Sequence, residues 1–401
     1  MKKLSILVLI LVLLVSTALS EGIAATEHPQ LEGNGYDTPE EAVLAYLDAM
    51  NNADVHGMLA TFAHESYVEH LDTDLYIQRM NSIFPQGTAN STPITDAYSA
   101  ELILFARYGS LASDLLRQYT TYTDDLDGMT RAPMNQEAID EHNQYYEQSI
   151  LQSIQGHVTF VEWVDAALLT SGTAISPVNR RNIAMQYGYV GADDLAELVV
   201  RFRINGADFL QCMTCAKYGG RWYNLLLHGN TASILGLTMN TVGLIPLYEA
   251  ANKESFLLSA EALDSTLLAE RDQYKASSLG GTHWQLVSLN QPDISLAASS
   301  EGALKNEADL WCELHFYSCG GATVMLTAGD ALYTRFDLTY RTTLLGVAWS
   351  ESDGKLHFDQ YSLPSRFGYR FNTEIVSAVW GGNFITILFQ DGTAAVFQRY
   401  D

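Results

Sequence analysis

The segment 191–230 constrains the fold of this chain more than any other, because its apolar and polar residues alternate as they do in β-strands. Within residues 198–204 every second side chain is apolar, while Glu197, Arg201 and Arg203 occupy the other row. Successive side chains of a strand point to opposite faces, so one face of this strand is expected to be buried and the other polar. The segment therefore predicts an antiparallel sheet.

An Asn205-Gly206 pair follows this strand and predicts a two-residue type I′ turn, since both central residues of such a turn need positive φ. A second turn at Gly219-Gly220 brings residues 221–228 back as a third strand. Folding about the first turn matches apolar with apolar residues and a cation with a carboxylate. The expected cross-strand pairs are Phe202–Phe209, Leu198–Met213 and Arg203–Asp208.

Two polar side chains of this meander, Gln211 and Asn224, fall on the same face as its apolar row. A polar group on such a face either bonds a buried partner or lines a pocket. Trp163 belongs to an earlier strand-like segment, 157–169. We take Gln211, Asn224 and Trp163 as candidate ligand-binding residues, with amides satisfied inside the core as the alternative. No residue stands out as catalytic.

The charge balance argues against two classes of partner. With 22 Lys+Arg against 47 Asp+Glu, the chain has a formal net charge of −25. Such a protein is repelled by nucleic acid and by anionic membrane surfaces, so neither is expected as a partner. Its 401 residues are enough for two or three domains.

The first 24 residues predict export. Lys2 and Lys3 precede an apolar run at 4–15, and small residues suited to cleavage follow. The run is shorter than the roughly 20 residues of a membrane span, so membrane attachment is expected only if this segment stays uncleaved. The mature protein is expected to be secreted or extracytoplasmic.

Neither cysteine nor histidine spacing predicts a metal centre or a cofactor. Cys212 and Cys215 are three apart in a strand, so their thiols should point to opposite faces. His64 and His70 are six apart, which does not fit a zinc-binding helix and favours an exposed helix end. The stretch 124–128 resembles the start of a calcium loop but lacks the glutamate that closes one, which favours a solvated acidic loop.

A helical segment precedes the meander. Thr38 is a good N-cap, Pro39 fits the first turn, and Glu41 completes a capping box. The sequence TPEEAVLAYLDAMNNADVHGMLATFA at 38–63, together with the meander at 192–230 that contains GGRWYNLLL, resembles the NTF2-like superfamily, especially exported members from Gram-positive bacteria.

This resemblance implies helices packed into the concave face of a bent antiparallel sheet, leaving a pocket. NTF2-like domains include enzymes, ligand binders and protein-binding modules, so the fold does not choose among them. The present chain departs from the simple pattern in a long helical segment at 71–156, which could also mediate a homodimer.

From residue 279 onward, short strand-like runs alternate with turns, as in HWQLVSL and NFITILF. Such spacing predicts a barrel or a sandwich. The opening residues 280–286 resemble the first strand of lipocalin-like and META-type β domains, which often begin Gly-Thr-x-Trp. This resemblance implies a barrel closed by Arg399 stacking on Trp284, with an interior that is either filled or holds one small ligand.

The expected fold class is α+β. The chain should comprise a signal peptide (1–24), a linker (25–37), an NTF2-like α+β domain (38–250) with its helical insertion at about 71–156, a helical connector (251–278) and a lipocalin-like antiparallel β domain (279–401).

The sequence favours an exported, non-catalytic binding protein for a small ligand, an envelope component or a protein partner. The alternatives are a hydrolase or isomerase with an acid or base in the NTF2-like pocket, and a purely structural or interaction module.

Overall fold

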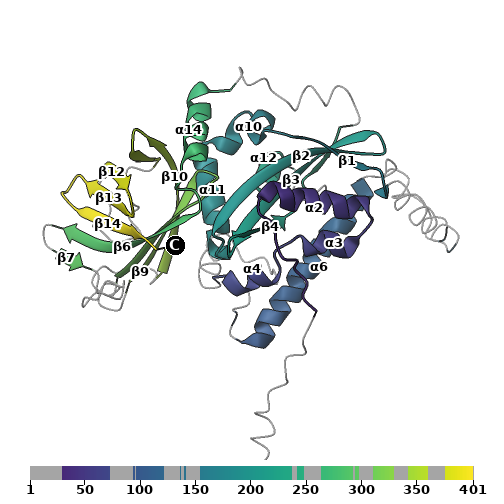
Figure 1. Cartoon of the computed structure of the whole chain (residues 1–401), viewed down its shortest axis with the longest axis horizontal. Coiled ribbons are helices and arrows are strands. Elements are labelled where there is room, and N and C mark those ends of the chain that lie inside the picture. The colour runs from purple at the N-terminus through teal and green to yellow at the C-terminus, as the bar shows by residue number, and fades with distance from the viewer. Residues whose placement is uncertain are drawn as a thin grey trace, which may run out of the picture.

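The chain forms an N-terminal α+β unit followed by a closed C-terminal β-barrel (Figure 1), as the expected fold class requires. The computed structural model describes residues 29–72, 96–121, 154–236, 242–247, 263–291, 294–297, 310–328, 342–359 and 375–400, with the single residues 94, 136 and 140. The signal segment, the acidic stretch 124–128 and residues 248–262 of the connector region lie outside the described residues.

The predicted meander is the centre of the N-terminal sheet. Asn205 and Gly206 both have positive φ, 52° and 87°, as a type I′ turn requires. The three expected cross-strand pairs, Phe202–Phe209, Leu198–Met213 and Arg203–Asp208, are all present. Four strands follow one another in space and a fifth pairs with the third: β1 (Val158–Trp163), β2 (Asp194–Ile204), β3 (Ala207–Tyr218), β4 (Arg221–Leu226) and β5 (Leu244–Pro246).

Helices α2 (Pro39–Asn51) and α3 (Val55–Ala60) and the second half of α6 (Ala97–Thr121) cover one face of this sheet. The first half of α6 and α4 (Glu65–His70) pack in a separate apolar cluster, with side chains from the other face. The Thr38 side chain accepts a hydrogen bond from the Glu41 N–H at 3.2 Å, so the predicted N-cap is confirmed. Asp54 caps α3 in the same way, through the N–H of Gly57.

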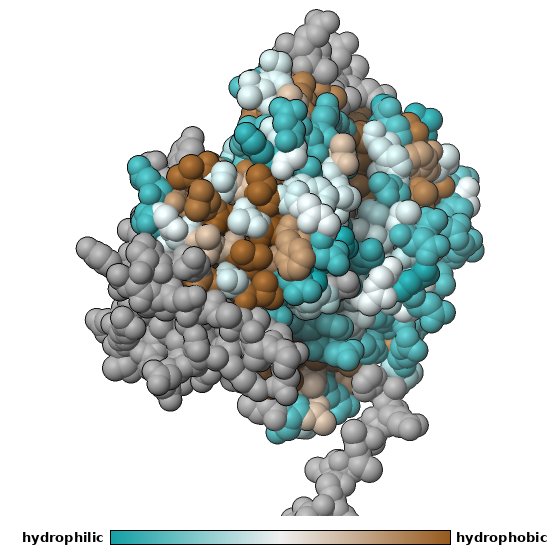
Figure 2. All heavy atoms as spheres, turned by 60° about the vertical axis from the view of Figure 1, so that its left-hand side comes forward, coloured by the Kyte–Doolittle hydropathy of each residue, from teal (hydrophilic) through white to brown (hydrophobic). Residues whose placement is uncertain are grey.

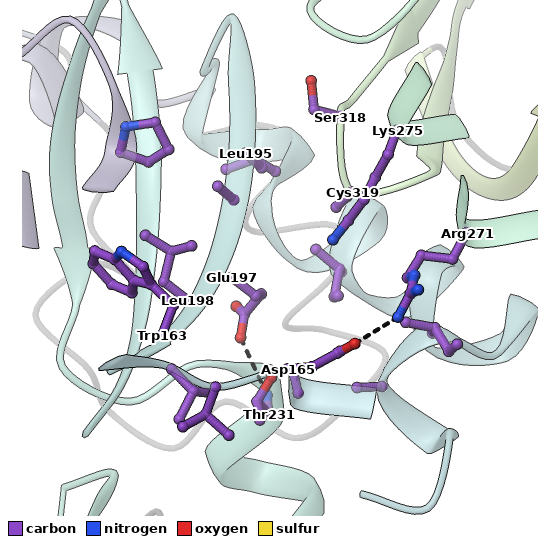
Figure 3. Close-up of a pocket in the computed structure, with 18 of the residues that line it drawn as sticks. Trp163, Asp165, Leu195, Glu197, Leu198, Thr231, Arg271, Lys275, Ser318 and Cys319 are labelled. Atoms are coloured by element: carbon purple, nitrogen blue, oxygen red, sulfur yellow. Dashed lines mark hydrogen bonds and ion pairs between the residues drawn. The ribbon is translucent and has the colours of Figure 1, made fainter. Parts of the chain in front are cut away.

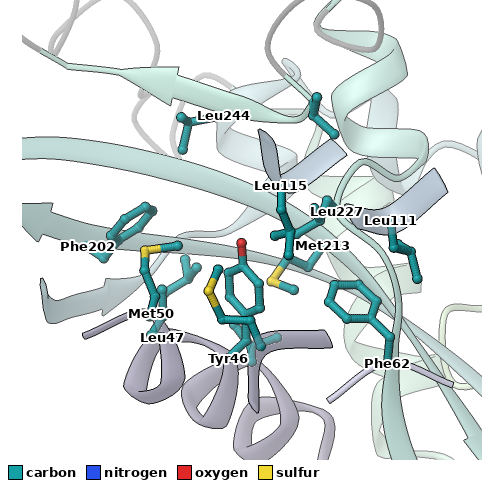
Figure 4. Close-up of a cluster of buried hydrophobic side chains, with 14 of the residues drawn as sticks. Tyr46, Leu47, Met50, Phe62, Leu111, Leu115, Phe202, Met213, Leu227 and Leu244 are labelled. Atoms are coloured by element: carbon teal, nitrogen blue, oxygen red, sulfur yellow. The ribbon is translucent and has the colours of Figure 1, made fainter. Parts of the chain in front are cut away.

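Apolar side chains fill the space between these helices and the sheet (Figure 4). Tyr46, Phe62, Phe202 and Met213 in this cluster are all fully buried. The resemblance to NTF2-like domains implies a pocket against the sheet, and at this face the described residues form a packed apolar cluster.

Several short elements were not expected from the sequence: α10 (Ala166–Leu169), η3 (Thr173–Ile175), η4 (Gly188–Val190) and α12 (Asn230–Ile234). Residues 171–179 contain η3 and the beginning of α11 (Pro177–Tyr187). Ser176 caps α11 by accepting from the Asn179 N–H at 3.3 Å, with Pro177 in the first turn. This Ser-Pro start was visible in the sequence and marks a helix.

The barrel is an antiparallel meander closed by pairing of its first and last strands, β6 and β14. Trp284 of β6 is fully buried and lies opposite the exposed Arg399 in that closing seam. The strands of the barrel are β6 (Thr282–Gln291), β8 (Leu310–Phe316), β9 (Gly321–Ala328), β10 (Thr342–Ser352), β11 (Lys355–Phe358), β12 (Ile375–Gly381), β13 (Phe384–Phe389) and β14 (Ala394–Arg399). Strand β7 (Ile294–Ala297) pairs with β6. Inward-facing apolar side chains from the described strands form one buried cluster inside the barrel.

The outer wall of the barrel carries apolar side chains as well. Figure 2 shows them gathered on the face turned toward the viewer. Val376, Val379, Phe384 and Leu388 of β12 and β13 are exposed, Val376 by 61%. Patches of this kind often mark contact surfaces on soluble proteins.

Two helices join the barrel to the N-terminal unit: α11 packs on β9 and β10, and α14 (Ser265–Ala276) packs on β10. Glycines allow the close approach of α11. A Cβ at Gly321 would lie 2.4 Å from the carbonyl oxygen of Arg180, and one at Gly346 would lie 2.5 Å from that of Arg181. Either substitution would push the helix away from the barrel.

The expectation of an exposed helix end at 64–70 is wrong for His64, which is fully buried, although His70 is exposed. The Nε2 of His64 lies 2.9 Å from the carbonyl oxygen of Leu59. Burial, with the nearby Arg107 guanidinium, lowers the pKa of His64 from 6.5 to about 4.

We expect the protein to lose stability as the pH falls from 6.5 to about 4, in part through His64. Its imidazole takes a proton in the unfolded chain before it does so in the folded one. The stabilisation is therefore complete above pH 6.5 and lost toward pH 4, by up to about 3 kcal/mol. Urea unfolding of His64→Gln at both ends of this range should show a smaller drop than the wild type. His70→Gln is the control, and an unchanged drop in His64→Gln would contradict this assignment.

Candidate functional site

Gln211, the first candidate ligand-binding residue, is fully buried in the core. Its Oε1 accepts a hydrogen bond from Nε2 of Gln118 at 2.6 Å. Its Nε2 donates to the carbonyl oxygens of Cys212 and Val242 at 2.9 and 3.1 Å. These contacts give this amide a structural explanation, and Gln211 does not line the cavity described below.

Asn224, the second candidate, is equally buried. Its Nδ2 donates to the carbonyl oxygen of Ala42 at 2.9 Å and to Oγ1 of Thr61 at 3.0 Å. The amide thereby joins β4 to α2 and to the residue after α3. A ligand-binding role for either amide stays a prediction, since the core contacts already satisfy both.

Trp163, the third candidate, lines a cavity of about 580 Å³. Strand β1 ends at this residue, and the chain turns through Val164 and Asp165 into α10. The side chain is 37% exposed. Residues of β2, α14 and the β8–β9 turn complete the walls (Figure 3). The cavity therefore lies where the N-terminal sheet, the connecting helix and the barrel meet.

One wall of the cavity is the edge of β2, whose residues 195–199 all contribute to the lining. Strand β1 pairs with β2 only between Val200 and Ile204. The N–H of Val164 extends this pairing by one hydrogen bond, to the carbonyl oxygen of Val199 at 2.9 Å. Among the described residues, no strand pairs with β2 on that side before this point.

Glu197 places a carboxylate in the wall of the cavity. Its Oε1 accepts from the hydroxyl of Thr214 at 2.5 Å and from the N–H of Asn230 at 3.3 Å, and its Oε2 accepts from the N–H of Thr231 at 3.2 Å. Burial raises the pKa of Glu197, while these hydrogen bonds oppose the rise. The carboxyl group is thus fixed in place by β3 and α12.

Two cations reach the cavity from α14. Asp165 caps α10 through the N–H of Ala167 at 2.9 Å and pairs with Nη1 of Arg271 at 2.5 Å, so Arg271 is already neutralised. Lys275 follows one turn later, and Figure 3 shows its side chain directed into the cavity. Within the described part of the chain, Lys275 has no ion-pair partner.

These titratable groups do not form a proton-transfer pair. Asp165 faces an arginine, which keeps its proton, and Glu197 bonds a hydroxyl and backbone N–H groups. Burial raises the pKa of the Cys319 thiol to about 12, so it is a poor nucleophile. The described residues include no group of three side chains placed to hold a metal ion.

One cross-strand pair in the sequence indicates this site. The predicted register sets Glu197 opposite Thr214, and that pair is the one formed in the structure. A carboxylate facing a hydroxyl on a mostly apolar sheet could have been taken as a candidate. No pattern along the chain connects Lys275 with β2, because the two meet only through the packing of α14.

No family model and no curated protein matches this chain. Among solved structures, the chain is similar to a cystatin-like protein from Ruminococcus gnavus, with 11% identity and a TM-score of 0.30. The similarity covers 81% of this chain and 88% of that one. A likeness at this level carries no inference about function. No helix among the described residues is long and apolar enough to cross a membrane.

Proposed function

We propose that this protein is an exported, non-catalytic binding protein whose ligand occupies the cavity between the sheet, α14 and the barrel. The cavity itself is the supporting observation. Its volume of about 580 Å³ falls within the range of about 300–1,000 Å³ that is typical of ligand sites. Aromatic, aliphatic and charged side chains line it together, as in sites that orient a ligand by a few polar contacts.

The sequence supports the same function. Residues 1–24 have the composition of a signal peptide, and the resemblances to exported NTF2-like proteins and to lipocalin-like barrels agree with a binding role. Neither resemblance selects the ligand, because both folds host several functions. A hydrolase or isomerase is not favoured, since Asp165 is held by an arginine and Glu197 by hydrogen-bond donors.

Native mass spectrometry of the protein, purified from the culture medium of its own host, tests this function. We expect a bound molecule on the wild type that is lost from Ala174→Trp, because Ala174 lines the cavity and an indole there would occupy it. Ala276→Trp is the matched control, since Ala276 is exposed on α14 and does not line the cavity.

Two results would contradict the proposed function. One is a ligand retained by a folded Ala174→Trp variant. The other is a wild-type protein that carries no bound molecule and shows no rise in Tm with any compound of a mixed panel of metabolites, sugars and peptides. A ligand that binds the folded state raises the Tm, so this result would mean that none of them binds.

A further inference from the structure

We propose that the ligand is an extended peptide segment that adds as a strand to the open edge of β2. This inference rests on the proposed function and names the chemical class of its ligand. A sheet edge with unpaired N–H and C=O groups is a template for another strand. Such an edge lines the cavity along residues 195–199.

The hydrogen-bonding pattern of β2 determines which groups face the cavity. Ile204 and Ala207 flank the two-residue turn and pair directly, so every second residue back from Ile204 bonds β3. The intervening residues 195, 197 and 199 face the opposite side, as the bond from Val164 to the carbonyl oxygen of Val199 confirms.

Counting partners among the described residues alone, two donors and two acceptors remain unpaired on this edge. The N–H of Leu195 bonds Oδ1 of Asp194 at 2.8 Å, and the carbonyl of Val199 is taken by Val164. The N–H groups of Glu197 and Val199 and the carbonyls of Leu195 and Glu197 have no partner among the described residues. Five residues of strand span about 13 Å at about 3.3 Å per residue, enough for a short extended segment.

The walls supply contacts for the side chains of such a segment. Trp163 and Ile175 contribute apolar side chains to the lining of the cavity. Lys275 is the lining cation without an ion-pair partner in the described part of the chain, so it fits a carboxylate on the peptide. Arg271 is held by Asp165 and is not available in the same way. An extended peptide that bears a carboxylate therefore matches the backbone edge and the free charge together.

The test uses a phage-displayed library of random dodecapeptides selected on the full-length mature protein. A selected peptide is then synthesised with single N-methyl groups along its backbone. Because only every second N–H of an added strand faces β2, we expect methylation at alternate residues to weaken binding about fivefold or more, with little effect between them. Hydrogen exchange at the Glu197 and Val199 amides should slow when the peptide binds.

Substitutions of Lys275 test whether its positive charge contributes to peptide binding. Lys275→Met should weaken binding of the carboxylate peptide about fivefold to tenfold, whereas Lys275→Arg should retain it. Lys275→Met should bind this peptide and the same peptide with its carboxylate replaced by a carboxamide equally well. The inference would be overturned if the selection enriched no peptide, or if N-methylation weakened binding without alternating along the peptide. If native mass spectrometry finds a bound non-peptide molecule that is lost from Ala174→Trp, the proposed function stands and the proposal of a peptide ligand is wrong. A strand supplied by a second copy of the chain would appear as a dimer that free peptide does not disrupt.

Discussion

Replacing Arg180 by alanine is expected to lower the free energy of unfolding by about 2–4 kcal/mol, because a buried polar group left without its partner costs about 1–3 kcal/mol and the packing of a buried side chain is lost with it. Arg180 lies on α11, in the N-terminal unit, and is 2% exposed. Its Nη1 donates to the carbonyl oxygen of Trp349 at 2.7 Å and to that of Gly320 at 3.3 Å. Its Nη2 pairs with Glu270 of α14 at 2.6 Å.

This one side chain thus joins α11, α14 and the barrel. Its guanidinium also lies 5.0 Å from the ring centroid of Tyr274, at cation–π distance. Without it, the buried carbonyl oxygen of Trp349 loses its side-chain donor, that of Gly320 keeps only the N–H of Trp349 at 3.0 Å, and Glu270 loses its cation. The large effect comes from leaving these groups unpaired, more than from the attraction itself.

Arg181→Ala is the matched control. The neighbouring Arg181 pairs with Asp359 of the barrel at 2.7 Å, but its side chain is 25% exposed, so we expect a loss of about 1 kcal/mol or less. Urea unfolding followed by tryptophan fluorescence and by circular dichroism measures both variants. If the two probes separate in Arg180→Ala, the barrel and the N-terminal unit unfold independently. Equal losses in both variants would show that Arg180 does not hold the units together.

The parts of the fold that the sequence predicted are those set by local alternation and turn chemistry. The Asn205-Gly206 turn determines the β2–β3 register, which the structure reproduces pair by pair. The same reasoning predicted that the Cys212 and Cys215 thiols point to opposite faces of the sheet, and they lie in two different hydrophobic clusters. Closure of the barrel also agrees with the expected strand and turn pattern.

The candidate site was harder to predict because contacts between distant segments create it. Gln211 and Asn224 stood out as polar residues on an apolar face, yet their partners come from α6 and α2, which local pattern does not place. Trp163 was selected for its residue type and does line the cavity. Lys275 belongs to a helix that looked like a connector, and its role as a wall depends on how α14 packs against the barrel.

The second large effect is expected in the core of the N-terminal sheet. Phe202 is fully buried in the cluster of Figure 4, and its ring lies 5.8 Å from that of Phe209 across the hairpin. Phe202→Ala should lower the free energy of unfolding by about 3–5 kcal/mol, because the lost transfer free energy adds to that of the cavity left behind. Phe202→Leu retains most of the volume and should lose less than half as much.

Phe160 provides the comparison, since it is the cross-strand neighbour of Phe202 on β1 and has the same side chain, but is 39% exposed. We expect Phe160→Ala to change the free energy of unfolding by less than about 1 kcal/mol. Chemical denaturation with a shared m-value measures all three variants on one scale. A loss in Phe160→Ala as large as that in Phe202→Ala would mean that the face of the sheet that buries Phe202 is also covered at β1. Because β1 ends only three residues later, at Trp163, that result would also place an additional covering segment beside the open edge of β2.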